Sequence, residues 1–89
     1  MNEEILKMFL GGEVRVIFRK KTNGIIRSLL GTLNKDDIPP EQYQTLSSIL
    51  GSGIKDLVVV WDIETNDWRS FYFSTIIEIF QSKQKKEVE

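Results

Sequence analysis

Five basic side chains in a short stretch near the start of the chain have the chemistry needed to bind phosphate. Residues 13–27 contain these five bases and one acid, Glu13, so the segment has a formal charge of +4. Lysine and arginine contact phosphate oxygens, and each such contact makes binding depend on salt. The five bases are Arg15, Arg19, Lys20, Lys21 and Arg27. The alternative is the solvated outer face of a hairpin, where cations discourage pairing with further strands.

Aromatic side chains near the end of the chain add the possibility of base stacking. In an extended strand over residues 68–73, Trp68 and Tyr72 point away from Phe71. If Phe71 belongs to the core, Trp68 and Tyr72 are exposed, and nucleobases can stack on them. Arg69 would then help to orient the bases. The alternative is that a helix from elsewhere in the chain covers these rings.

Acidic residues dominate the middle of the chain. Seven acids and two bases, Lys35 and Lys55, give residues 34–67 a formal charge of −5. Beside the positive segment, this predicts an electrical dipole whose acidic side can dock on a basic host protein. Ordinary turn composition is the alternative. The seven acids are Asp36, Asp37, Glu41, Asp56, Asp62, Glu64 and Asp67.

The absence of two residue types excludes much chemistry. The chain has no cysteine and no histidine, which rules out disulfides, zinc sites built from these residues and histidine-based proton transfer. No glycine-rich loop is followed by the Lys-Ser/Thr that a phosphate-binding loop needs. Asp62 and Asp67 flank a predicted solvent-facing turn, which does not give two carboxylates the different surroundings that acid–base catalysis needs, and they lack the spacing of a calcium loop. We therefore expect no enzyme activity, no metal and no cofactor.

Length and composition indicate one small globular domain. With 89 residues, the chain has room for a single core, which we place in residues 1–80, followed by a flexible tail over 81–89. A net charge of −1 and a pI near 5.5 argue against a general coater of DNA. No apolar run is long enough to cross a membrane, and the first residues are acidic where a signal peptide is basic. We expect a soluble, cytoplasmic protein.

The first third of the chain predicts a helix and a hairpin. Acids in the first turn and apolar residues at helical spacing predict a helix over residues 2–10 that ends at two glycines. Alternating apolar residues predict a strand over 13–21 and a second over 25–33, joined by an Asn-Gly turn. We expect Arg15, Arg19 and Arg27 to share one face of this hairpin. Gly31 indicates a bulge or sharp bend.

The remaining chain predicts a helical insertion and three further strands. Residues 39–50 begin with prolines and carry apolar side chains at helical spacing, and Gly51 is a suitable stop. Strands are expected over 55–63, 68–73 and 76–80. The fold class is therefore mainly β: a five-stranded SH3/Sm-like barrel with a short N-terminal helix and a helical insertion between strands two and three. Closing the sheet protects its edges.

The chain also resembles a known family over residues 13–80, most specifically over 57–77. A valine-rich strand ends in Trp-Asp at 58–62, Trp-Arg-Ser-Phe follows at 68–71, and a Ser-Thr-Ile-Ile turn follows at 74–77. These segments resemble the small phage and prokaryotic family of Sm-like SH3 β-barrels related to the WYL domain. The resemblance implies the barrel and a phage origin. It also implies nucleic-acid or nucleotide recognition through arginines on this surface, of which Arg69 stands at a matching position.

Together these patterns favour a non-enzymatic, phage-encoded regulatory protein that binds nucleic acid or nucleotide. Lysines and arginines of the hairpin would hold phosphates, while Trp68, Arg69 and Tyr72 would contact bases. One alternative is a module that docks on a host protein, such as RNA polymerase or a defence factor, through its acidic side and the segment 39–50. A third possibility is a homo-oligomer that associates through the edge of the last strand.

Overall fold

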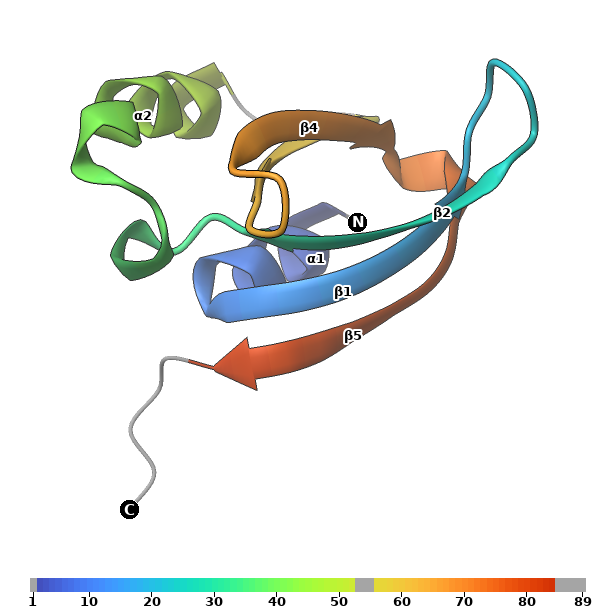
Figure 1. Cartoon of the computed structure of the whole chain (residues 1–89), viewed down its shortest axis with the longest axis horizontal. Coiled ribbons are helices and arrows are strands. Elements are labelled where there is room, and N and C mark those ends of the chain that lie inside the picture. Colours follow the sequence, from blue (N-terminus) through green and yellow to red (C-terminus); the bar gives the residue numbers. More distant parts are fainter. Residues whose placement is uncertain (1, 53–55, 85–89) are drawn as a thin grey trace.

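In the computed structural model of the chain, five antiparallel strands form a curled sheet with two helices beside it (Figure 1). The structure describes residues 2–52 and 56–84. The strands are β1 Gly12–Arg19, β2 Ile26–Thr32, β3 Leu57–Asp62, β4 Asp67–Tyr72 and β5 Ile76–Gln84, in the spatial order β4-β3-β2-β1-β5. The helices are α1 Asn2–Leu10 and α2 Tyr43–Ser52, and 3₁₀ turns lie at Lys35–Asp37, Pro40–Gln42 and Phe73–Thr75. The predicted fold class, including the insertion between β2 and β3, is confirmed.

Alternating apolar and polar side chains along β1 show which face of the sheet is buried and which is exposed. Val14 and Val16 are fully buried, while Arg15 and Ile17 on the opposite face are only partly covered. Successive side chains of a strand point to opposite faces of the sheet. The core therefore draws on every layer of the fold: Phe9, Val14, Val16, Leu29, Leu33, Ile38, Leu46, Val58, Val60, Trp61 and Phe71.

Helix α1 closes one end of this core. Its first turn carries Glu3 and Glu4 and its last turn carries Lys7, which suits the helix dipole at both ends. Phe9 is fully buried, and its ring centroid lies 6.3 Å from that of Phe71. None of the described helices combines the length and apolar character that crossing a bilayer requires.

The sheet curls because two of its strands share only a short contact. In the described chain, the β2–β3 ladder consists of Gly31 opposite Asp62 and Thr32 opposite Trp61. Beyond this junction the two parts of the sheet diverge and fold over the core. As a result, Phe18 of β1 and Phe71 of β4 stack with their ring centroids 5.2 Å apart, although two strands separate them in the sheet order.

Gly31 occupies the junction for a steric reason. A Cβ atom at this position would lie 2.6 Å from Val60 Cγ2 and 3.3 Å from the Phe9 ring. Only glycine lets the β2 backbone approach β3 and α1 so closely. The register shifts of the sheet are recorded between β1 and β5, at Glu13/Val14 and Ile17/Phe18, and not at Gly31.

Two elements end later than the sequence predicted. Helix α2 continues through Gly51 to Ser52, whose hydroxyl donates to the Ile49 carbonyl oxygen at 3.0 Å, so Gly51 does not stop it. Strand β5 was expected to end at Phe80 but pairs with β1 as far as Gln84. Gln81 supports this extension by donating from Nε2 to the Met8 carbonyl oxygen at 2.9 Å. Residues 85–89 of the predicted tail lie outside the described residues.

Candidate functional site

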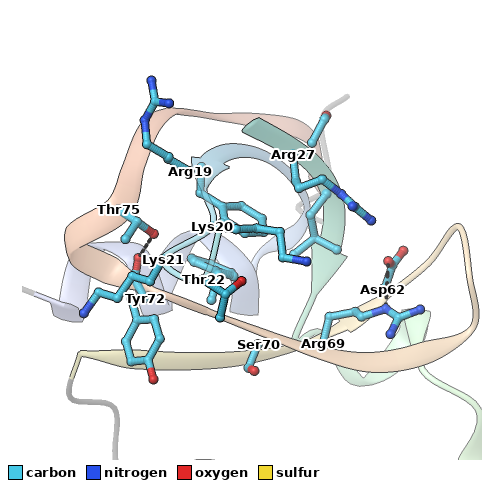
Figure 2. Close-up of a pocket in the computed structure, with 14 residues that line it drawn as sticks. Arg19, Lys20, Lys21, Thr22, Arg27, Asp62, Arg69, Ser70, Tyr72 and Thr75 are labelled. Atoms are coloured by element: carbon cyan, nitrogen blue, oxygen red, sulfur yellow. Dashed lines mark hydrogen bonds and ion pairs between the residues drawn. The ribbon is translucent and has the colours of Figure 1, made fainter. Parts of the chain in front are cut away.

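A hollow of about 350 Å³ opens where the two parts of the sheet diverge, and we call it the basic pocket (Figure 2). The first part of its wall is the end of β1 and the loop after it, the second is β2 at residues 27–29, and the third is β4 at residues 69–72. Among the described residues, five cations and one acid line it. The cations are Arg19, Lys20, Lys21, Arg27 and Arg69, and the acid is Asp62.

The loop over residues 20–25 presents two of these cations. The Lys20 amide donates to the Ile25 carbonyl oxygen at 2.9 Å, and the Gly24 amide donates to the Lys20 carbonyl oxygen at 2.8 Å. Asn23 accepts from the Ile25 amide through its side chain at 3.0 Å. The predicted hairpin is confirmed, but its loop is wider than a two-residue Asn-Gly turn. Of the Asn-Gly pair only Gly24 has a positive φ, +76°, whereas the tight turn needs two such residues.

The floor of the basic pocket is apolar and its rim is polar. Phe18, Leu29 and Phe71 lie at its base, with the stacked phenylalanine rings shared with the core. Thr22 and Thr75 also line the pocket, and the Thr75 hydroxyl donates to the Tyr72 carbonyl oxygen at 2.6 Å. Binding sites for organic ligands commonly combine an apolar floor with a few polar groups.

Of the five pocket cations, two form ion pairs, Arg19 donates to a backbone carbonyl oxygen, and the other two have neither contact within the described residues. Lys21 Nζ lies 4.0 Å above the centre of the Tyr72 ring and 3.8 Å from Asp56 Oδ2. Arg69 Nε lies 3.8 Å from Asp62 Oδ2. Within the described residues, neither Lys20 nor Arg27 has an ion pair. These two side chains are therefore the ones most available to an anion.

The orientation of the arginines differs from the sequence prediction. Arg27 lies opposite Phe18 in the β1–β2 ladder, so its side chain is on the core-facing side of the sheet. Arg15 and Arg19 are on the other, outer face of β1. The prediction that the three arginines share one face is therefore wrong. Figure 2 shows the Arg19 guanidinium pointing away from the hollow, and its Nη1 donates to the Gly24 carbonyl oxygen at 2.9 Å.

Two of the predicted binding residues lie outside the basic pocket. Arg15 is held by Glu64, with Nη2 and Oε2 3.2 Å apart, and its Nη1 donates to Ser28 Oγ at 3.1 Å. Trp68 is half-buried, and its Nε1 donates to Gln42 Oε1 at 2.9 Å. The helical insertion therefore covers Trp68, which was the alternative to exposure. The other six predicted residues line the pocket together.

Three of the seven acids of the middle segment lie beside cations, through the pairs Glu64–Arg15, Asp56–Lys21 and Asp62–Arg69. Asp56 also accepts from the Ser74 amide and hydroxyl, so it helps to hold the turn before β5. At these three positions the opposite charges are interleaved. The expected acidic side as a whole stays a prediction.

Asp62 is a charged residue of the pocket that the sequence analysis did not assign to a binding site. It is the last residue of β3 and faces Asp67 across the β3–β4 ladder. Within the described residues, no group of three or more carboxylates gathers to hold a metal ion. One sequence signal could have predicted the role of Asp62: it stands where a buried strand ends and a turn begins, and an aspartate there accepts hydrogen bonds from the backbone amides of the turn.

Comparisons with known proteins agree with this architecture. A family model described as WYL_2, Sm-like SH3 beta-barrel fold, matches residues 2–77. A phage T4 protein described as an uncharacterized 11.5 kDa protein in the Gp31-cd intergenic region is 32% identical over 76 residues, which cover 85% of this chain and 74% of the relative. No solved structure matches the chain.

Proposed function

Since the chain belongs to the WYL_2 family of Sm-like SH3 β-barrels, we propose that it is a phage-encoded binding protein that holds nucleic acid or nucleotide in the basic pocket. In this proposal the protein acts by binding rather than by catalysis, and its role is regulatory.

The observation that carries the proposal is the concentration of positive charge at one hollow. The five cations and one acid of the basic pocket sum to +4, although the whole chain carries −1. Such a local excess stabilises phosphate groups, and phosphate contacts supply most of the affinity of nucleic-acid-binding proteins. Lys20 and Arg27 are in the right place to make these contacts because they flank the opening without a competing carboxylate.

The aromatic content of the same hollow favours a nucleotide over a simple anion. Tyr72 borders the hollow and is 39% exposed, and its ring extends from the outer face of β4, whereas the Phe18–Phe71 stack lies on the pocket side (Figure 2). Bases stack on exposed aromatic rings without regard to sequence. The volume of about 350 Å³ lies at the lower end of the size range of ligand pockets, which suits one nucleotide unit rather than a duplex.

The test is the binding of a fluorescein-labelled single-stranded oligonucleotide, measured by fluorescence anisotropy at increasing salt. The double variant Lys20→Glu, Lys21→Glu should bind more weakly than the wild type, and its affinity should depend less on salt. The matched control is Lys7→Glu, Lys35→Glu, which makes the same change of charge outside the pocket and should bind almost normally. Equal affinities of the wild type and the pocket variant would refute the proposal.

A further inference from the structure

Asp62 places a nearly buried carboxylate in the wall of a pocket that is otherwise cationic. Its side chain is only 9% exposed. Oδ1 accepts from the backbone amides of Glu64 at 2.9 Å and Thr65 at 3.2 Å, so the β3–β4 turn fixes the orientation of the carboxylate. Oδ2 is the oxygen that faces Arg69, at 3.8 Å from Nε.

That separation leaves Oδ2 without a hydrogen bond. A distance of 3.8 Å allows electrostatic attraction but is too long for a hydrogen bond. Within the described residues, no other donor reaches Oδ2. A buried carboxylate oxygen without a donor is unfavourable, and in folded proteins nearly all such atoms find a partner. Because Asp62 lines the basic pocket, Oδ2 is available to accept from a donor that enters it.

The guanidinium of Arg69, next to Asp62, limits which chemical groups can bind at Oδ2. Oδ2 accepts a hydrogen bond, and Arg69 beside it donates. Arg69 is about half exposed, so it is free to adjust toward a ligand, whereas Asp62 is fixed by its turn. A group that matches this pair presents an N–H donor and a hydrogen-bond acceptor side by side, attached to the same carbon atom.

We propose that Asp62 and Arg69 select a nucleobase whose exocyclic amine lies next to a ring-nitrogen acceptor, as in cytosine and adenine. This inference rests on the proposed function and names the bases that the pocket prefers. The amine donates to Asp62 Oδ2, and the ring nitrogen accepts from Arg69. Carboxylates accept from the cytosine amine in known protein–DNA contacts. Uracil can also offer N3–H to Oδ2 and O4 to Arg69, but its second carbonyl oxygen, O2, then lies beside N3–H and repels the carboxylate, whereas the corresponding oxygen of cytosine lies on the side of Arg69.

The experiment compares labelled oligo-dC and oligo-dU of the same length, which differ in this edge of the base, by fluorescence anisotropy. The wild type should prefer oligo-dC by about tenfold, as expected for one base-edge contact. In Asp62→Asn the amide oxygen still accepts from Glu64 and Thr65, but an NH₂ group replaces Oδ2 and cannot accept. The preference should disappear, and oligo-dU should bind more tightly because a negative charge is removed.

Asp67→Asn is the matched control because it makes the same change on the same hairpin without lining the pocket. It should keep the preference for oligo-dC. A second measurement changes the ligand instead of the protein: oligonucleotides of N4,N4-dimethylcytidine lack the amine donor and should bind the wild type no better than oligo-dU. This comparison remains valid even where Asp62→Asn fails to fold.

The outcomes separate the two proposals. Equal binding of oligo-dC and oligo-dU by the wild type would overturn the role of Asp62 while leaving nucleic-acid binding intact. An unchanged preference in Asp62→Asn, or tight binding of the dimethylated oligonucleotide, would also overturn it. Failure of every oligonucleotide to bind would refute the proposed function itself.

Discussion

Tyr72 is the aromatic side chain with the best position for stacking. Its ring is exposed on the outer face of β4, beside the basic pocket, with the Lys21 ammonium 4.0 Å above its centre (Figure 2). Tyr72→Ala should weaken the binding of a single-stranded oligonucleotide by about 1–3 kcal/mol, the usual contribution of one stacked base. Tyr72→Phe keeps the ring and should bind nearly as well as the wild type. Anisotropy titrations of both variants provide the measurement.

The stability of these variants is the control. Because Tyr72 is substantially exposed, its removal should change the free energy of unfolding in urea only slightly. Wild-type affinity in Tyr72→Ala would mean that the ring serves only as the partner of Lys21.

Trp68 and Tyr72 show where single residues escape sequence-based prediction. Both alternate with Phe71 along β4, and Phe71 is in the core, which was the condition for their exposure. Their different surroundings depend on the insertion, because Gln42 reaches Trp68 from 26 positions earlier in the chain. Strand periodicity gives the face of a side chain but not what covers it. The exposure of Tyr72 and the burial of Trp68 therefore follow only from the tertiary structure.

At the scale of elements, the β2–β3 junction is the most sensitive packing contact. Gly31→Ala would put a methyl group 2.6 Å from Val60 Cγ2, between two backbone segments that cannot easily separate. Overpacking of this kind costs about 1–3 kcal/mol of stability. Urea unfolding should show this loss, and adding Val60→Ala should restore part of it, so that the two changes are not additive.

Gly51→Ala is the matched control for this substitution. Gly51 lies inside α2, and a Cβ atom there would meet nothing within 4 Å. The same chemical change should therefore stabilise the protein by about 0.5–1 kcal/mol through helix propensity. A loss of stability at Gly51, or none at Gly31, would contradict this account of the packing.

The elements were predictable to the extent that local patterns define them. Alternation predicted β1, and acids with helical spacing predicted α1. The end of β5 was not predictable because Gln81, Lys83 and Gln84 carry no apolar alternation, and they are in a strand because β1 offers a partner. The prediction that α2 ends before Gly51 was wrong because a glycine is compatible with a helix end but does not require one.

At the scale of the whole molecule, the basic pocket exists because distant segments converge. Residues 19–22, 27–29 and 69–72 meet only after the sheet curls at Gly31. The sequence could identify the cations but not which of them would remain unpaired. Arg15 was equivalent to Arg27 in the sequence, yet the fold brings Glu64 to Arg15 and leaves Arg27 beside the hollow.

The number of unpaired cations in the basic pocket predicts how strongly the binding of single-stranded DNA depends on salt. Because the net charge is −1, the molecule as a whole does not attract a polyanion, and phosphate contacts come from the pocket. Lys20 and Arg27 are its two cations without an ion pair or a hydrogen bond within the described chain. Single-stranded DNA releases about 0.7 counterions per neutralised phosphate, so two contacts predict a slope of log K against log salt of about −1.4.

Single substitutions should show how much each cation contributes to the slope of log K against log salt. Arg27→Gln should reduce its magnitude to about 0.7, whereas Arg15→Gln should leave it unchanged because Arg15 is already paired with Glu64. The measurement is a set of anisotropy titrations from low to moderate salt. A wild-type slope steeper than about −3 would require four or more phosphate contacts, so cations beyond Lys20 and Arg27 would have to bind the strand. If Arg27→Gln and Arg15→Gln changed the slope equally, the idea that Arg27 is available to phosphate while Arg15 is occupied by Glu64 would be wrong.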